Sequence, residues 1–205
     1  MDIKTTLSET TKSIYGGLLI ALGCIANLSS DNRLIGAFLF SIGLITICKL
    51  QLNLYTGKIA FGFNNDTWKI FALNCISIII SAMFYSCTRI CNVDKVISIV
   101  ETKIDDYWFS LLYLAVACEI CIIIAVVANK KLENSVVSTI IIALAVTVFV
   151  YCGFEHCIAD LFYFTVYAFY CHTNILKILL DWIIIILGNT LAAMVYKEHV
   201  QLYMK

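Results

Sequence analysis

Apolar residues fill this chain in long runs instead of marking one face of amphipathic helices. A helix of about 20 residues crosses a hydrocarbon layer of about 30 Å. Six runs are long enough for such a crossing, and they cover residues 13–30, 33–54, 67–88, 107–129, 136–171 and 174–196. The pattern predicts an all-α membrane protein with six transmembrane helices in a single transmembrane domain over residues 1–205.

Two of these runs contain a polar interruption beside a glycine. The second run ends in LNLYTGKIAFGF, where Thr56, Gly57 and Lys58 interrupt the hydrophobicity. Because the chain has no proline, a break in a helix depends on glycine, whose backbone tolerates unusual dihedral angles. We therefore expect helix 2 to break at Tyr55–Thr56–Gly57, with a short second half.

The fifth run is too long for one simple crossing. It has no charge over residues 136–154, and then Glu155, His156 and Asp160 follow Gly153 within a few residues. Ionisable side chains inside a membrane segment are costly and usually functional. We expect helix 5 to break at Gly153 and these side chains to surround a functional site.

The two halves of the chain repeat this plan. The first break is followed by Asn74 in the next run, and the second break is followed by Asn189 in the LGN sequence at 187–189. Three spans per half give the halves opposite orientations, which predicts a 3+3 inverted repeat. Unwound backbone at membrane depth survives only against protein or a watery cavity, so the two breaks mark a permeation path.

Composition agrees with a membrane protein and excludes several other classes. The chain is 61% hydrophobic and 14% charged, with a mean hydropathy of +0.92, whereas soluble domains carry about 25% charged residues. Its net charge is zero without a basic run, so we expect no nucleic-acid partner. We find no nucleophile–base pair or phosphate-binding loop and expect no enzymatic activity.

The ten cysteines raise the question of a metal site. Most lie within apolar runs, where thiols behave as small hydrophobic side chains. Cys152, His156 and Cys157 would share one face only on an unbroken helix. We expect neither a metal nor another cofactor.

Lysine and arginine residues are distributed unequally between the two membrane faces. Eight lie on the face that holds both termini, and five lie on the opposite face. This bias predicts cytoplasmic termini, with residues 1–12 as an N-terminal arm and 197–205 as a short tail. The expected location is the cell (plasma or inner) membrane, where the chain crosses the lipid bilayer several times.

Five sequence segments carry a resemblance to a known family: GGLLIALG (16–23), FSIGLI (40–45), LYTGK (54–58), GFEHCIADLF (153–162) and LGN (187–189). In their order and spacing the chain resembles the formate/nitrite transporter family of small-anion channels. The resemblance implies an aquaporin-like arrangement of six helices and a homopentamer in which each protomer has its own pore. It also implies passage of small monovalent anions, such as formate or nitrite, often with a proton.

The same resemblance implies roles for individual residues. Thr56 matches the threonine between the two halves of helix 2, and His156 matches the single histidine that faces the middle of the pore. The apolar constrictions of the pore correspond to Leu44, Leu54, Tyr55 and Phe149. Glu119 stands where the family usually has an asparagine facing the histidine. Lys58 and Asp160 also depart from the family's T-G-N and I-A-N sequences.

Physical chemistry suggests what these side chains do. The Thr56 hydroxyl and a His156 ring N–H would donate hydrogen bonds to an anion, and Lys58 either is solvated or attracts the anion. We expect Glu155, Asp160 and Asn189 to support the site. Glu155 would bond free amides at the break. Asp160 would either cap the second half-helix or orient the imidazole.

Glu119 is the only charge between Tyr107 and Asn129, so a partner is expected. The candidates are Lys58, Lys49 and His156. We expect Glu119 either to pair with one of them or to act as a neutral hydrogen-bond donor. In the first case, Glu119→Gln should shift the pH dependence of transport.

The sequence thus predicts a channel or secondary transporter for formate, nitrite or a related weak-acid anion, linked to protons through His156. Two alternatives stay open. The pore would pass another small species, such as hydrosulfide or a neutral solute, or the chain would be a non-conducting membrane scaffold.

Overall fold

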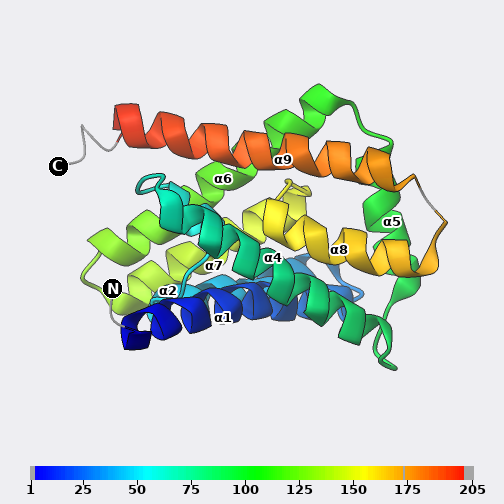
Figure 1. Cartoon of the computed structure of the whole chain (residues 1–205), viewed down its shortest axis with the longest axis horizontal. Coiled ribbons are helices and arrows are strands. Elements are labelled where there is room, and N and C mark those ends of the chain that lie inside the picture. The colour runs from blue at the N-terminus through cyan, green and yellow to red at the C-terminus, as the bar shows by residue number, and fades with distance from the viewer. Residues whose placement is uncertain (1–2, 173, 201–205) are drawn as a thin grey trace.

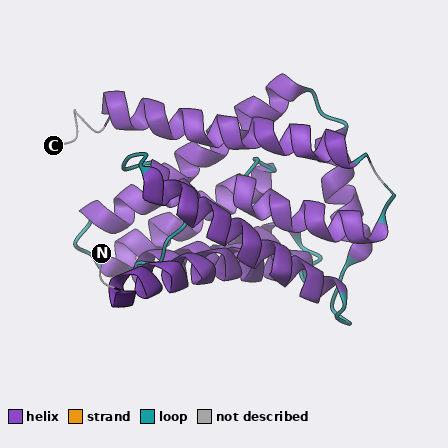
Figure 2. Ribbon diagram, in the orientation of Figure 1, coloured by secondary structure: helices purple, strands orange, loops and turns teal. Residues whose placement is uncertain are grey.

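The computed structural model describes residues 3–172 and 174–200, and these form helices joined by short loops (Figure 2). The helices are α1 (Ile3–Leu28), α2 (Arg33–Lys49), α3 (Tyr55–Ile59), α4 (Asn65–Ser86), α5 (Val93–Ile104), α6 (Trp108–Lys131), α7 (Ser135–Cys152), α8 (Cys157–Tyr170) and α9 (Ile175–Val195), followed by a π-helical turn, Tyr196–Val200. The all-α fold predicted from the apolar runs is confirmed.

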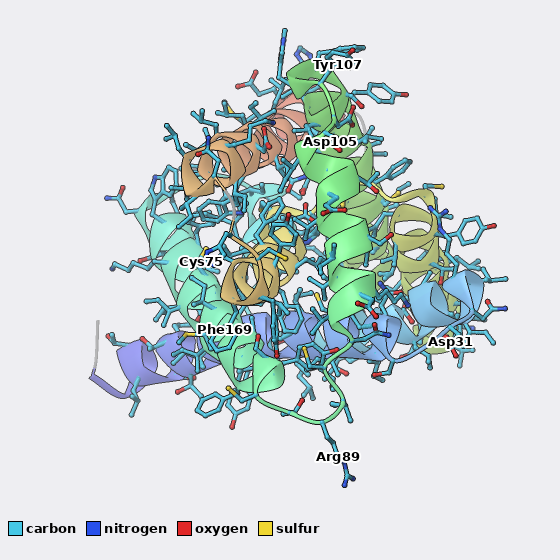
Figure 3. The ribbon with its side chains drawn as sticks, turned by 90° about the vertical axis from the view of Figure 1, so that its right-hand side faces the viewer. Asp31, Cys75, Arg89, Asp105, Tyr107 and Phe169 are labelled. Carbon is cyan, nitrogen blue, oxygen red and sulfur yellow. The ribbon has the colours of Figure 1, made fainter. Side chains whose placement is uncertain are left out.

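The long helices lie side by side in one bundle (Figure 1). Helix α1 packs against α2 and α4, α6 packs against α7 and α9, and α8 lies between α4 and α9. The start of α1 and the end of α9 lie at one end of the bundle. Helix α5 runs across the other end, where Figure 3 shows it in front of the long helices, with Asp31 nearby.

Five helical segments of the described chain are long and apolar enough to cross a membrane: Thr6–Leu28, Asn65–Ser86, Trp108–Lys131, Ser135–Cys152 and Ile175–His199. The predicted second span, 33–54, is helical only as far as Lys49, which gives α2 17 residues. The predicted fifth span is divided into α7 and the 14-residue α8. Six apolar runs therefore become five full-length segments and two shorter helices.

The predicted terminal arms are only partly described. Residues 3–12 of the expected arm already belong to α1, and residues 1–2 lie outside the described part of the chain. The expected tail begins within the turn after α9, and its residues 201–205 also lie outside the description.

The chain leaves α2 earlier than the sequence suggested. Gln51, just past the last residue of α2, has φ +53°, in the left-handed region. Tyr55 then starts α3, so Thr56 and Gly57 are helical and the break covers residues 50–54. The expectation that Gly57 forms the break is wrong, because a side chain of α4 fixes the start of α3: Asn74 Oδ1 accepts the Tyr55 N–H at 2.8 Å. Helix α3 has only five residues.

Helix α7 ends in a Schellman motif at Gly153, which has φ +74°. The Gly153 N–H donates to the Val150 carbonyl at 3.2 Å, and the Phe154 N–H donates to the Phe149 carbonyl at 2.9 Å. Glycine is favoured in this left-handed position because it has no Cβ. The chain then stays non-helical until α8 begins at Cys157.

Helix α5 was not predicted, because 12 residues are too short for a span and its apolar residues do not form a run. Val96 and Val100 are buried on one face, and Lys103 is buried on the same side. The amphipathic pattern brings a lysine from a surface connection against the start of α8.

Candidate functional site

His156 and Thr56 meet in the interior, from the two interrupted regions of the chain. His156 Nε2 lies 3.1 Å from Thr56 Oγ1, and both residues are buried. On its other side, Nδ1 accepts the Ala159 N–H at 3.2 Å and so caps α8. An accepting Nδ1 places the proton of the neutral ring on Nε2, which therefore donates to Thr56. The Thr56 hydroxyl hydrogen is left for another acceptor.

Two phenylalanine rings pack in a row beside the His156 imidazole. The Phe149 ring stacks on His156, with centroids 5.8 Å apart and 21° between the planes. Phe40 of α2 meets Phe149 edge-on at 5.7 Å. Phe149 was predicted as a constriction residue, whereas Phe40 was not singled out although it opens the FSIGLI segment.

A cavity of about 530 Å³, here the α5-side cavity, reaches these rings from the α5 end of the bundle. Phe40, Phe149 and His156 line its inner part. Charged residues also line it, among them Asp31, Arg33, Lys95, Asp106 and the buried Lys103.

A second cavity of about 530 Å³, here the α3-side cavity, lies at the opposite end, where α1 starts and α2 finishes. Leu44 and Leu54 line it, as does Lys58. Phe40 and Leu44, one in each cavity, are a single turn apart on α2, which corresponds to about 6 Å along the helix axis. A thin layer of packed side chains thus separates the two cavities.

The remaining predicted constriction residue, Tyr55, faces elsewhere. Its hydroxyl lies 2.9 Å from Thr190 Oγ1 of α9, and its ring packs against Phe71 of α4. Tyr55 lines neither the α5-side nor the α3-side cavity. As N1 residue of α3, it points toward the helices behind the site.

Asn189 holds the start of α8 as Asn74 holds the start of α3. Asn189 Oδ1 accepts the Cys157 N–H at 2.9 Å, and Nδ2 donates to the carbonyls of Ala115 and Glu155. Asn74 Nδ2 likewise donates to carbonyls, those of Ser13 and Asn53. Each asparagine thus joins the first residue of a short helix, the loop before it and a long helix.

Lys103 forms a buried ionic cluster with Glu155 and Asp160. Lys103 Nζ lies 2.5 Å from Glu155 Oε2 and 3.1 Å from Asp160 Oδ1. Burial alone would lower the pKa of the Lys103 ammonium, but the carboxylates of Asp160 and Glu155 raise that pKa above its ordinary value. The ammonium therefore stays charged at neutral pH.

This cluster corrects two expected roles. Glu155 does not bond the free amides at the break, because its carboxylate pairs with Lys103 and Asn189 takes the Cys157 amide. Asp160 neither caps α8 nor contacts the imidazole in the described structure, because His156 itself is the cap. Lys103 comes from a helix that the sequence did not predict.

Glu119 is fully buried on α6, and neither carboxylate oxygen has a hydrogen-bond partner among the described residues. The expected pairing with Lys58, Lys49 or His156 is therefore wrong for the described structure. Lys49 donates instead to Ser138 Oγ at 2.7 Å and to the Ser135 carbonyl. Lys58 is exposed toward the α3-side cavity.

Three residues of the site escaped the sequence reasoning: Phe40, Lys103 and, as a capping residue, Asn74. Asn74 was noted for its place in the repeat, and its parallel with Asn189 was the available signal. Lys103 had none, since a lysine in a surface connection is normally solvated.

The helical bundle and its two opposed cavities define a membrane protein with a candidate pore. A family model described as formate/nitrite transporter matches residues 3–203, so the chain belongs to the formate/nitrite transporter family. The resemblance predicted from the sequence segments is confirmed. With its apolar helices, the chain is a multi-pass membrane protein.

Two solved structures share the fold. One is described as "Pentameric formate channel with formate bound", with a TM-score of 0.85 and 18% identity over 100% of each chain. The other is an "FNT family ion channel", with a TM-score of 0.85 and 19% identity over 98% of this chain and 92% of that one. A comparison with curated proteins finds no significant match.

Proposed function

We propose that this protein is a channel or secondary transporter for small monovalent anions, such as formate, nitrite or a related weak-acid anion. One observation carries the proposal: two cavities enter from opposite ends and are separated by a thin layer that contains the Thr56–His156 pair. Membership in the formate/nitrite transporter family and the fold of a formate channel support it.

The proposed topology is a 3+3 inverted repeat. Helix α1, the α2–α3 pair and α4 form one half, and α6, the α7–α8 pair and α9 form the other. The matching hydrogen bonds of Asn74 and Asn189 support this division. In the proposed orientation, the chain lies in a plasma or inner membrane with both termini on the cytoplasmic side. The α3-side cavity then opens to the cytoplasm.

An anion that enters either cavity must lose water before it passes the layer. Phe40 and Phe149 on one side, and Leu44 and Leu54 on the other, form dry collars that a hydrated ion does not cross. Between them the Thr56 hydroxyl and the His156 N–H donate to the anion. These donors, with the N-terminal end of α8, offset part of the desolvation cost.

Proton linkage follows from the weak-acid chemistry of the anion. Protonation between the collars lets the neutral acid leave through an apolar constriction. For His156 to supply that proton, Nδ1 must first release the Ala159 N–H and take up a proton. The imidazole is thus a hydrogen-bond donor at rest and a proton donor after this rearrangement.

Lysines in the α3-side cavity favour anion entry. Lys58 and Lys130 line this cavity with Lys12, and Lys12 is paired with Glu9. Lys130 lies over the Phe61 ring at 4.1 Å. Lys58 forms no salt bridge among the described residues, and its ammonium raises the local anion concentration near the collar formed by Leu44 and Leu54.

The test is formate and nitrite uptake into proteoliposomes at several pH values, with Thr56→Val compared with Thr56→Ser. Valine keeps the shape but removes the hydroxyl, so flux should fall on the order of tenfold or more, the effect of losing one hydrogen bond to a charged group. Serine restores the hydroxyl and should retain most of the flux. Equal flux for the two variants would contradict the role of Thr56.

A pore for hydrosulfide or a neutral solute is the second candidate. The buried carboxyl groups of Glu119 and Asp160 favour it, because either group, once ionised, would place a negative charge near the pore and oppose anions. Uptake of hydrosulfide or of a neutral solute, without flux of formate or nitrite, would select this candidate. No flux of any substrate would instead select a non-conducting scaffold.

A further inference from the structure

The cluster of Lys103, Glu155 and Asp160 holds one carboxyl group more than its ammonium balances. Both carboxyl groups touch Lys103 Nζ, and all three side chains are at most 9% exposed. If both carboxyl groups were ionised, the cluster would keep one uncompensated negative charge away from bulk water. Such a charge is costly in a buried site, and two close carboxyl groups avoid it by sharing a proton.

The contacts indicate which carboxyl group takes the proton. Glu155 Oε2 is the closer of the two to the ammonium, at 2.5 Å against 3.1 Å for Asp160 Oδ1. Asp160 Oδ2 is buried and has no hydrogen-bond partner among the described residues, although Asp160 lines the α5-side cavity. This free oxygen is available for a proton.

We infer that Lys103, Glu155 and Asp160 form a proton-binding site separate from the His156 imidazole, in which Asp160 takes up one proton from the α5-side cavity. The reaction is protonation of a carboxylate by water or hydronium in that cavity. With the proton bound, the cluster has no net charge. Without it, the cluster carries one negative charge beside His156.

The titratable groups that face the cluster are Cys24 from α1, Lys103 from α5, Cys118 from α6, Cys157 and Tyr163 from α8, Asp181 from α9, and the adjacent His156. The thiols and the phenol are ordinarily neutral at physiological pH. Lys103 is therefore the cation that balances the cluster.

Other cations of the α5-side cavity are engaged elsewhere. Lys95 Nζ donates to the carbonyls of Asn27 and Ser30 at 2.6 Å each. The Arg33 guanidinium lies over the Tyr151 ring at 5.2 Å. Neither forms a salt bridge with Glu155 or Asp160 in the described structure.

The inference rests on the proposed function only for its effect on transport. As pH rises, Asp160 loses its proton and a negative charge appears next to the anion path. A charge about 8 Å from the permeating anion lowers its occupancy roughly tenfold at an effective dielectric constant of about 20 with partial screening. Anion flux should therefore fall as pH rises through the titration of this site.

Infrared spectroscopy tests the proton site without any transport assay. The purified protein should show the carbonyl stretch of a protonated aspartic acid, which disappears at higher pH. Labelling the wild-type protein with ¹³C-carboxyl aspartate should move this band and leave that of any glutamic acid in place. Asp160→Asn should abolish it, whereas Asp31→Asn, an exposed aspartate of the same cavity, should not.

The flux assay then tests the consequence, with the same pH on both sides of the membrane. Between low and high pH, the flux of Asp160→Asn should fall by a factor roughly tenfold smaller than the flux of the wild-type protein. The flux of Asp31→Asn should fall as much as that of the wild-type protein. An aspartic acid band absent at every pH in the wild-type protein would overturn the inference. A band without any formate or nitrite flux would leave the proton site standing and reject the proposed function instead.

Discussion

At the scale of single residues, the buried ionisable groups of this protein differ in whether they have a hydrogen-bond or ionic partner. The Lys103 ammonium contacts two carboxyl groups, whereas the Glu119 carboxyl group has no hydrogen-bond partner among the described residues. An unpartnered carboxylate would be very unstable inside the bundle, so Glu119 is neutral there. The expected charge pair is therefore wrong for the described residues, and the hydrogen bond expected of a neutral Glu119 has no acceptor among them.

Glu119→Gln is expected to leave the pH dependence of anion flux unchanged. Glutamine replaces one neutral group with another of the same shape. At low pH, where a glutamic acid is protonated in both the folded and the unfolded chain, the free energy of unfolding should therefore change by about 1 kcal/mol or less. At neutral pH the variant should be the more stable protein, because only the wild-type side chain must take up a proton on folding. The measurements are flux against pH in proteoliposomes and unfolding by a denaturing detergent. Glu133→Gln, at an exposed glutamate, provides the baseline. A shifted pH profile specific to Glu119→Gln would show that Glu119 ionises during transport.

At the scale of elements, two short helices begin in the interior, and each depends on one asparagine. Asn74 and Asn189 are both fully buried, and each makes three hydrogen bonds. Interior helix starts need such partners because their first N–H groups have no intrahelical acceptor. The asparagines, more than the glycines, determine where α3 and α8 begin.

Asn74→Ala and Asn189→Ala should therefore destabilise the protein to a similar extent. Each change removes three hydrogen bonds and leaves the buried N–H that starts the short helix without its side-chain acceptor, at a cost of about 3 kcal/mol. Asn134→Ala is the matched control, because Asn134 caps α7 at an exposed site and should cost about 1 kcal/mol. Unfolding free energies in detergent check the order. If Asn74→Ala or Asn189→Ala lowered the free energy of unfolding by no more than Asn134→Ala, that asparagine would not hold the start of its short helix.

At the scale of the whole molecule, the outer faces of the long helices are strongly apolar. Ile124 of α6, Leu144 of α7 and Leu191 of α9 are about half exposed. An apolar hollow of about 700 Å³ lies between α6 and α9. Lipid or further protomers must cover these surfaces, because exposed apolar area of this extent is unfavourable in water.

The homopentamer expected from the resemblance to the formate/nitrite transporter family should persist in mild detergent. The 23.0 kDa chain should then elute with a protein mass five times larger. Light scattering with detergent correction, or native mass spectrometry, measures that mass. A single-chain mass under conditions that preserve anion flux would reject the pentamer.

The sequence by itself determined the class of protein and much of its interior. Long apolar runs impose membrane helices because backbone groups in lipid must bond within their own helix. The Gly153 break was predictable, since a glycine beside three ionisable residues interrupts such a run. The segments that resemble the family singled out His156 and Thr56 as candidate pore residues, and the structure places them in contact.

Only the tertiary structure decided which side chains meet. Lys103 lies 52 residues before Glu155 in the chain, and nothing in its local sequence indicates a buried ion pair. The start of α3 likewise depends on Asn74 from the next helix instead of on Gly57. Local patterns record the preferences of neighbouring residues, whereas partners for buried polar groups come from distant segments that packing brings together.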